Sequence, residues 1–198
     1  MRENPETVCD GCGAAVPAGH LRDRIRRIEM GSRFRPPRIR VLFLAKAAEF
    51  RREDFFYGTG QEPRSEAADH FFDELMSGLG LGGLDTTRET RLLEFQKRGF
   101  FLAHAFECPL PAGQLDGTQL IERHGPAIVA RVKNSFKPGR IVLLSKVLER
   151  HLLPLLVGAG LGETVLVAPP PPLKSAGGAL ERWRASLAQL QGEIKTSN

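Results

Sequence analysis

The sequence lacks the features that mark secreted, membrane and disulfide-stabilised proteins. It has only three cysteines in 198 residues, which argues against a disulfide framework and in favour of free thiols or metal ligands. The first residues, MRENPETVCDG, contain no apolar signal-peptide core, and the most apolar stretch, 151–168, is interrupted by Pro154, glycines and Glu163. We therefore expect a soluble cytoplasmic protein without a membrane partner, and we assume a monomer.

Common catalytic motifs are also absent. The chain contains no Walker A motif, no dinucleotide-binding fingerprint, no G-x-S-x-G elbow and no HExxH motif, which excludes the commonest α/β enzyme classes. Its charge is only moderately unbalanced, at 28 Lys and Arg against 23 Asp and Glu. This balance permits an anionic partner such as nucleic acid without requiring one. The arginine-rich segments 22–27 and 33–40 either contact a phosphate backbone or form solvated faces.

Four short apolar runs alternate with segments of helical periodicity. The runs cover residues 39–45, 99–106, 140–145 and 164–168. None alternates strictly between apolar and polar, which is typical of strands buried on both faces of a parallel sheet. The order predicts an α/β fold, a three-layer α/β/α sandwich with a central four-stranded, mostly parallel sheet, over residues 39–198.

An N-terminal segment, residues 1–38, precedes this domain and is expected to pack on it. It carries the CxxC sequence CDGC near its start. Further along, HLRDRIRRIEM places Leu21, Ile25 and Ile28 at helical spacing and predicts a short amphipathic helix.

Polar side chains follow the ends of the predicted strands. Lys46 comes directly after the first apolar run, and His104 lies near the end of the second. Because ligands bind beyond the carboxyl ends of the strands in open α/β sheets, we expect both side chains at one rim. Each also has a simpler interpretation, since an isolated histidine in a strand is more often a hydrogen-bonded structural residue and a rim lysine more often contacts phosphate.

The cysteines form a candidate metal site. Only two residues separate Cys9 from Cys12, so one tight turn can present both thiolates to one metal ion. Cys108 follows the second predicted strand as a third donor, and His20 and His124 are the candidates for the fourth. The alternative is three unconnected thiols with His124 as a helix-cap or surface residue.

Two loops carry candidate ligand contacts. Phe55, Phe56 and Tyr57 stand beside glycines near the expected rim, where rings either stack on a nucleobase or fill the hydrophobic end of the sheet. The segment VAPPPPLKSAGG brings Lys174 and Ser175 to the start of the last predicted helix. Backbone N–H groups there suit a phosphate, and the alternative is a rigid connection without a ligand.

In this order the motifs resemble the uracil-DNA glycosylase superfamily, most closely its iron–sulfur branch, from about Cys9 to Leu190. The matching segments are VLFLAKAAE, FFYG, HAFECPLP, HGPAIVARVKNSFKPGRIVLLS and APPPPLKSAGG. The resemblance implies a uracil-DNA glycosylase-like fold, single- or double-stranded DNA as the partner, and a pocket for a flipped deaminated or damaged base. It also implies that Phe56, Tyr57, Lys174 and Ser175 contact the base or the DNA.

The resemblance further implies a metal centre. It aligns Cys108 with the third cluster cysteine of the iron–sulfur branch and His124 with the fourth. Cys9, Cys12, Cys108 and His124 would then hold either zinc or a [4Fe–4S] cluster with one histidine ligand.

The catalytic residues of the family are not retained. Its acidic position aligns with Lys46, its base-reading asparagine with His104, and its motif histidine with Pro169. Glu49 or Glu53 would have to replace the carboxylate, His104 would donate to the base, and Lys46 would act as an amine nucleophile or contact a phosphate.

The sequence therefore leaves open whether the chain is a DNA glycosylase or a catalytically inactive nucleic-acid-binding descendant. A third hypothesis is a small-molecule hydrolase. It is the weakest of the three, because the sequence shows no nucleophile–base pair.

Overall fold

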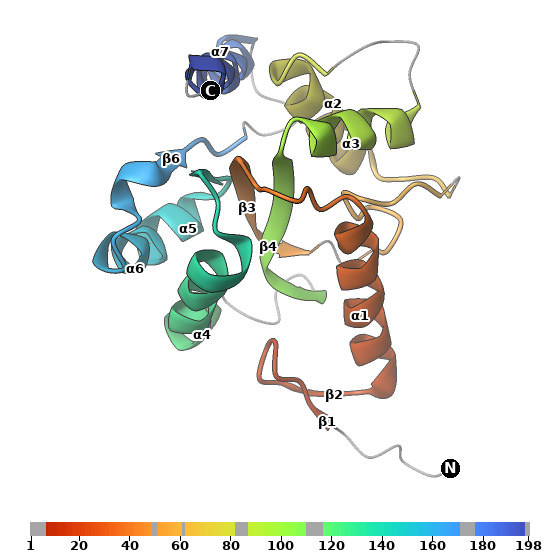
Figure 1. The fold of residues 1–198 in the computed structure, drawn as a ribbon. Coiled ribbons are helices and arrows are strands. Elements are labelled where there is room, and N and C mark those ends of the chain that lie inside the picture. The colour runs from red at the N-terminus through yellow and green to blue at the C-terminus, as the bar shows by residue number, and fades with distance from the viewer. Residues whose placement is uncertain are drawn as a thin grey trace.

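A four-stranded sheet forms the centre of the computed structural model, which describes residues 7–48, 51–60, 62–81, 87–109, 117–170 and 177–196 (Figure 1). The strands are β3 (Val41–Ala48), β4 (Phe100–Pro109), β5 (Arg140–Leu143) and β6 (Val165–Val167). Their order is β4-β3-β5-β6, and every neighbouring pair is parallel. The predicted α/β class and central parallel sheet are confirmed.

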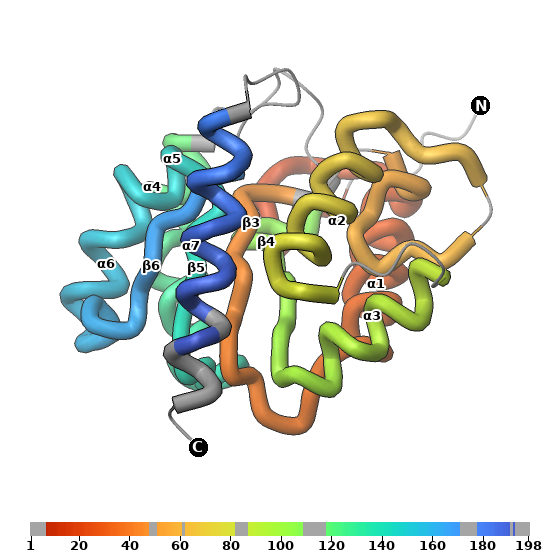
Figure 2. The backbone as a smooth tube through the Cα atoms, turned by 90° about the horizontal axis from the view of Figure 1, so that it is seen from above, coloured from red at the N-terminus to blue at the C-terminus, as the bar shows by residue number. Residues whose placement is uncertain are grey.

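Helices cover both sides of this sheet and complete the three-layer sandwich. The helices are α1 (Ala18–Arg33), α2 (Glu66–Gly78), α3 (Arg88–Lys97), α4 (Gly117–Arg131), α5 (Lys146–His151), α6 (Leu153–Gly158) and α7 (Gly177–Thr196). Figure 1 shows α2, α3 and α7 on one side of the sheet and α1 and α4 on the other, and Figure 2 shows α7 running along the sheet. Helix α4 continues into the π-helix η1 (Val132–Phe136), and the 3₁₀-helix η2 (Gly162–Thr164) precedes β6.

The sheet is held by apolar side chains on both faces. The residues of β3 from Val41 to Leu44 and those of β5 from Ile141 to Leu143 have no exposed surface. This burial explains why the strands appear in the sequence as continuous apolar runs. Ser65 and Thr87 begin α2 and α3 by accepting hydrogen bonds from the backbone N–H groups of Ala68 and Thr90.

The aromatic segment 55–57 closes the outer edge of β4. The Tyr57 hydroxyl accepts a hydrogen bond from the Leu102 N–H (2.7 Å) and donates one to the Leu102 carbonyl (2.9 Å). An edge strand otherwise leaves such groups unpaired. Phe56 lies in the core, with its ring 5.3 Å from that of Phe72 and 5.7 Å from that of Phe95.

The N-terminal segment packs on the domain through α1, which lies against β4. Before it, β1 (Thr7–Val8) and β2 (Ala15–Val16) form a two-stranded antiparallel hairpin. None of the helices in the described part of the chain is long and apolar enough to cross a membrane.

Candidate functional site

Three thiols and one imidazole meet where the hairpin, α1 and the end of β4 come together. The donor atoms of Cys9, Cys12, His20 and Cys108 all lie within 4.8 Å of one another. The sulfur atoms of Cys9 and Cys108 are 3.6 Å apart, and the Cys12 sulfur is 3.8 Å from His20 Nε2. All three cysteines are buried and none is in a disulfide. We call these four residues the Cys/His cluster, which could bind a metal ion.

Local geometry explains why these residues converge. The turn between β1 and β2 is closed by a hydrogen bond from the Gly13 N–H to the Cys9 carbonyl (2.7 Å), and Gly13 has a φ of 69°, which favours glycine. A Cβ on Gly11 would lie 3.0 Å from the Cys108 sulfur, so glycine permits the close approach of β4. His20 comes from the first turn of α1.

The surroundings shift the pKa values of Cys9 and Cys108 in opposite directions. Burial works to raise the pKa of Cys9, but the backbone N–H groups of Gly11 and Cys12 and the neighbouring thiols lower it by more. Burial and the adjacent Cys9 raise the pKa of Cys108. A cation between them would favour the thiolate form of both. The donor chemistry therefore fits a metal ion.

The histidine that lies with the three thiols is His20, whereas the resemblance indicated His124. The His124 ring lies on α4, 6.0 Å from the ring of Phe106, and borders the turn at Gly13. Its Nε2 atom is buried and has no hydrogen-bond partner in the described part of the chain. His20 joins the sulfur atoms instead, because α1 starts two residues after the hairpin and directs its first turn back over the CDGC turn.

A cavity of about 310 Å³ lies between α1, the outer edge of β4 and the end of α4. In the described part of the chain its charged lining consists of four arginines and one carboxylate, with aromatic rings and His104 among the other lining residues. We call it the arginine cavity, defined by Arg24, Arg27, Arg35, Arg131, Glu107 and Tyr57.

Helix α1 places two arginines, Arg24 and Arg27, in the lining of this cavity beside Ile28. Arg27 is only 2% exposed, whereas Ile25 and Ile28 are 66% and 43% exposed. The predicted helix is present, but an inward apolar stripe is not. Arg24, Arg27 and Gly31 share a helical face with His20. This spacing is the one signal for the arrangement in the sequence, and the search for motifs does not use it.

Arg24 contacts the Cys/His cluster and also lines the arginine cavity. Its Nη1 atom lies 3.8 Å from the Cys9 sulfur and forms an ion pair with Asp10, and its side chain lines the arginine cavity. A cation in this position favours negative charge on the thiolates. The Cys/His cluster and the arginine cavity therefore share one side chain.

A carboxylate that is only 15% exposed, Glu107, also lines the cavity. Glu107 Oε2 is 3.8 Å from His104 Nδ1, and Glu107 Oε1 is 3.8 Å from Arg131 Nη1. Burial works to raise the pKa of Glu107, but His104, when protonated, and Arg131 bring it below its usual value. Arg131 is held in place because it donates to the carbonyl oxygens of His104 and Ala105.

The structure does not bring Lys46 and His104 together. Ala45 is the register partner of His104, and since successive side chains in a strand alternate, Lys46 projects from the opposite face of the sheet. Lys46 is exposed, whereas His104 is buried and lines the arginine cavity with Tyr57. Glu49, Lys174 and Ser175 lie outside the described residues.

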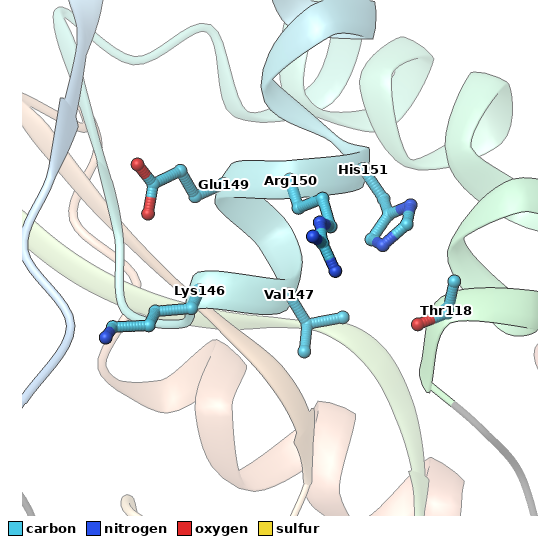
Figure 3. A pocket seen from close by; sticks show the side chains of 6 residues that line it. All are labelled: Thr118, Lys146, Val147, Glu149, Arg150 and His151. Atoms are coloured by element: carbon cyan, nitrogen blue, oxygen red, sulfur yellow. The ribbon is translucent and has the colours of Figure 1, made fainter.

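A second cavity, of about 480 Å³, is lined by the start of α5 and by Thr118 of α4 (Figure 3). Figure 3 shows the side chains of Lys146 and Glu149 pointing away from Thr118 and His151. Lys146, Glu149 and Arg150 are exposed. Because its charged groups diverge into solvent, this cavity is a weaker candidate than the arginine cavity.

No family model matches the chain, and no curated protein matches it either.

Proposed function

We propose that this chain is a nucleic-acid-binding protein similar to the uracil-DNA glycosylases, and that the arginine cavity receives a base extruded from DNA. One observation carries the proposal. Tyr57 and His104, which stand at the aromatic and base-reading positions of the resemblance, line the same cavity as four arginines. Guanidinium groups bind phosphates, so the four arginines suit the phosphate of a nucleotide.

Excision of the base is the enzymatic part of the proposal, and Glu107 supports it. Base release develops positive charge on the sugar and negative charge on the departing base, so a carboxylate on one side and donors on the other stabilise the transition state. Glu107, whose side chain is 15% exposed, lies beside His104 and Arg131. In this proposal Glu107 faces the sugar, while His104 and Arg131 face the base.

A specific observation favours the second candidate, a descendant that binds nucleic acid without catalysis. Lys46 occupies the acidic position of the resemblance, yet it is exposed and projects from the face opposite to His104. A lysine there cannot take the part of a carboxylate beside the bound base.

We propose a single zinc ion at the Cys/His cluster. With zinc–ligand bonds of about 2.0–2.3 Å, tetrahedral geometry places the donors roughly 3.5–3.8 Å apart. Two donor pairs are 3.6 and 3.8 Å apart, close to that spacing, and all four donors lie within 4.8 Å of one another. Each ligand of a four-iron cluster binds a different iron, so its donors stand further apart. The zinc would supply structural cross-linking of the hairpin, α1 and β4.

The test of function is binding and base release with purified full-length protein. Uracil-containing single-stranded and duplex oligonucleotides, with thymine-containing controls of the same sequence, are titrated by fluorescence anisotropy at low and high salt. We expect binding that weakens steeply with salt. Release of free uracil identifies a glycosylase, and binding without release identifies the inactive descendant. Absence of binding at low ionic strength would reject both.

The metal is tested by elemental analysis and a visible spectrum of protein purified without oxygen. One equivalent of zinc and no visible absorption are expected. Iron with broad visible absorption would overturn the zinc assignment and favour a cluster.

A further inference from the structure

Positive side chains outnumber negative ones in the lining of the arginine cavity, even though Arg24 is also paired with Asp10 outside the lining. Four guanidinium groups line it, and Glu107 is the one carboxylate among the described lining residues. Burial lowers the pKa of Arg131, and the charge of Arg24 adds to this effect. Holding like charges together in a partly dehydrated site costs free energy that a bound anion offsets.

Among the described residues, two of the four arginines, Arg24 and Arg131, keep one hydrogen-bond donor free. The Nε atoms of Arg24 and Arg131 are buried without a hydrogen-bond partner in the part of the chain that the structure describes. The guanidinium carbons of Arg35 and Arg131 lie 5.3 and 5.4 Å from the centre of the same ring, Phe136. Planar guanidinium groups around one space match the oxygen atoms of a phosphate.

The backbone holds this arrangement in place. Phe136 is the last residue of the π-helix η1, which follows Arg131, and both residues line the cavity. The Arg35 guanidinium is fixed by a hydrogen bond to the Ser135 carbonyl (2.5 Å). Such π-helical turns are frequent at functional sites.

We propose that the arginine cavity binds a phosphate monoester, the terminal phosphate of a nucleotide, whether free or at the end of a nucleic-acid strand. The proposal deepens the proposed function, on which it rests for the nucleotide part of the ligand. A dianionic monoester offsets two guanidinium charges, whereas a neutral base or nucleoside offsets none. The volume, about 310 Å³, lies at the lower end of the range for small-molecule sites and accommodates more than a phosphate ion.

The test compares ligands that differ only in the phosphate. Deoxyuridine monophosphate, deoxyuridine and inorganic phosphate are titrated into the full-length, metal-loaded protein by isothermal titration calorimetry. We expect the monophosphate to bind about ten times more tightly than the nucleoside, or better, because hydrogen bonds to charged groups are worth that much. Equal affinity for the nucleotide and the nucleoside would overturn the proposal.

Two variants on one helix separate the cavity from general charge. Arg27→Gln removes a buried guanidinium from the lining and is expected to weaken monophosphate binding about ten- to a hundredfold. Arg22→Gln removes the same charge from an exposed position of α1 outside the cavity and should change binding less than about twofold. Equal losses in both variants would contradict a site.

A third variant covers the case in which Arg27→Gln does not fold. Arg35→Ala changes an exposed residue, so the fold, checked by circular dichroism, is expected to persist. Its monophosphate affinity should fall while its nucleoside affinity stays unchanged. Unchanged monophosphate affinity in folded Arg35→Ala would count against the site.

Oligonucleotides with and without a terminal phosphate distinguish the sources of the monoester and the two proposals. Preference for the phosphorylated oligonucleotide over the free nucleotide assigns the site to strand ends, and the reverse preference assigns it to free nucleotides. If oligonucleotides bind equally well with and without the terminal phosphate, and the free nucleotide does not bind, the phosphate site is rejected. The proposed function then remains intact. Binding of the free nucleotide alone rejects nucleic-acid binding and leaves the phosphate site intact.

Discussion

Single side chains in this protein replace interactions that secondary structure normally supplies. Tyr57 is the clearest case, because its hydroxyl pairs both backbone groups of Leu102 on the outer edge of β4. The Tyr57 side chain is almost fully buried, so water cannot take over these bonds.

Tyr57→Phe is therefore expected to lower the free energy of unfolding by about 1–3 kcal/mol, the cost of leaving buried polar groups unsatisfied. Urea unfolding followed by circular dichroism measures this loss. The nucleotide affinity measured in the same samples should change less, since the ring remains in the cavity wall. An unchanged unfolding midpoint would mean that another group pairs the edge of β4.

The identity of the fourth metal donor is also decided by single residues. His20→Ala is expected to reduce the bound metal well below one equivalent, because the remaining three thiols bind weakly without the imidazole. His124→Ala is the matched control, since His124 borders the same turn but its ring packs against Phe106. Metal content measured by elemental analysis after dialysis compares the two variants. Loss in His124→Ala with retention in His20→Ala would reverse the assignment.

Among the elements, the strands were predictable and the orientation of α1 was not. Buried parallel strands are apolar on both faces, so their runs stand out in the sequence without knowledge of the partners. Even so, β3 extends through Lys46 to Ala48, because pairing with β4 continues to Pro109 across a register shift. Periodicity alone marks a helix but does not say which stripe meets the sheet, and in α1 the charged stripe does.

The candidate site depends on contacts between distant residues, which the sequence does not reveal. Cys9 and Cys108 are 99 positions apart, and their residue types and the resemblance suggested a shared site that the spacing alone could not establish. The choice between His20 and His124 required the position of the hairpin turn. Tyr57 and His104 were singled out from the sequence, whereas Glu107 and Arg131 gain a role only when α4 folds over the end of β4.

The fully buried residues of α1 are Arg27 and Gly31, and its apolar contacts with the cores come from the partly buried Leu21 and Met30. Its first turn is also tied to the hairpin and to β4 at the Cys/His cluster. Removing the metal with a chelator is therefore expected to loosen α1 before the sheet unfolds. Hydrogen–deuterium exchange should show faster exchange over 18–33 with protection of 41–44 retained. Equal loss of protection in both segments would mean that the metal stabilises the whole domain, and no change would mean that it stabilises neither.

Over the whole molecule, the sites are linked because Arg24 touches the Cys/His cluster and lines the arginine cavity. Cysteine thiolates attract this guanidinium, and α1 carries it together with Arg27 and His20. A ligand that binds only the docked form of α1 stabilises that form by mass action. The cluster and the cavity are therefore expected to strengthen each other's ligands reciprocally.

This coupling predicts that metal removal weakens nucleotide binding and that saturating nucleotide slows metal loss. Chelator-treated protein should bind deoxyuridine monophosphate about 5- to 150-fold more weakly than metal-loaded protein, the usual range of such coupling. Transfer of metal to a coloured chelator, followed with and without the nucleotide, measures the reciprocal effect. Lys46→Ala is the control, because Lys46 projects from the face opposite to His104 and lies outside the cavity lining. Its coupling should equal that of the unmodified chain. Equal nucleotide affinity with and without metal would show that the two sites act independently despite the shared arginine.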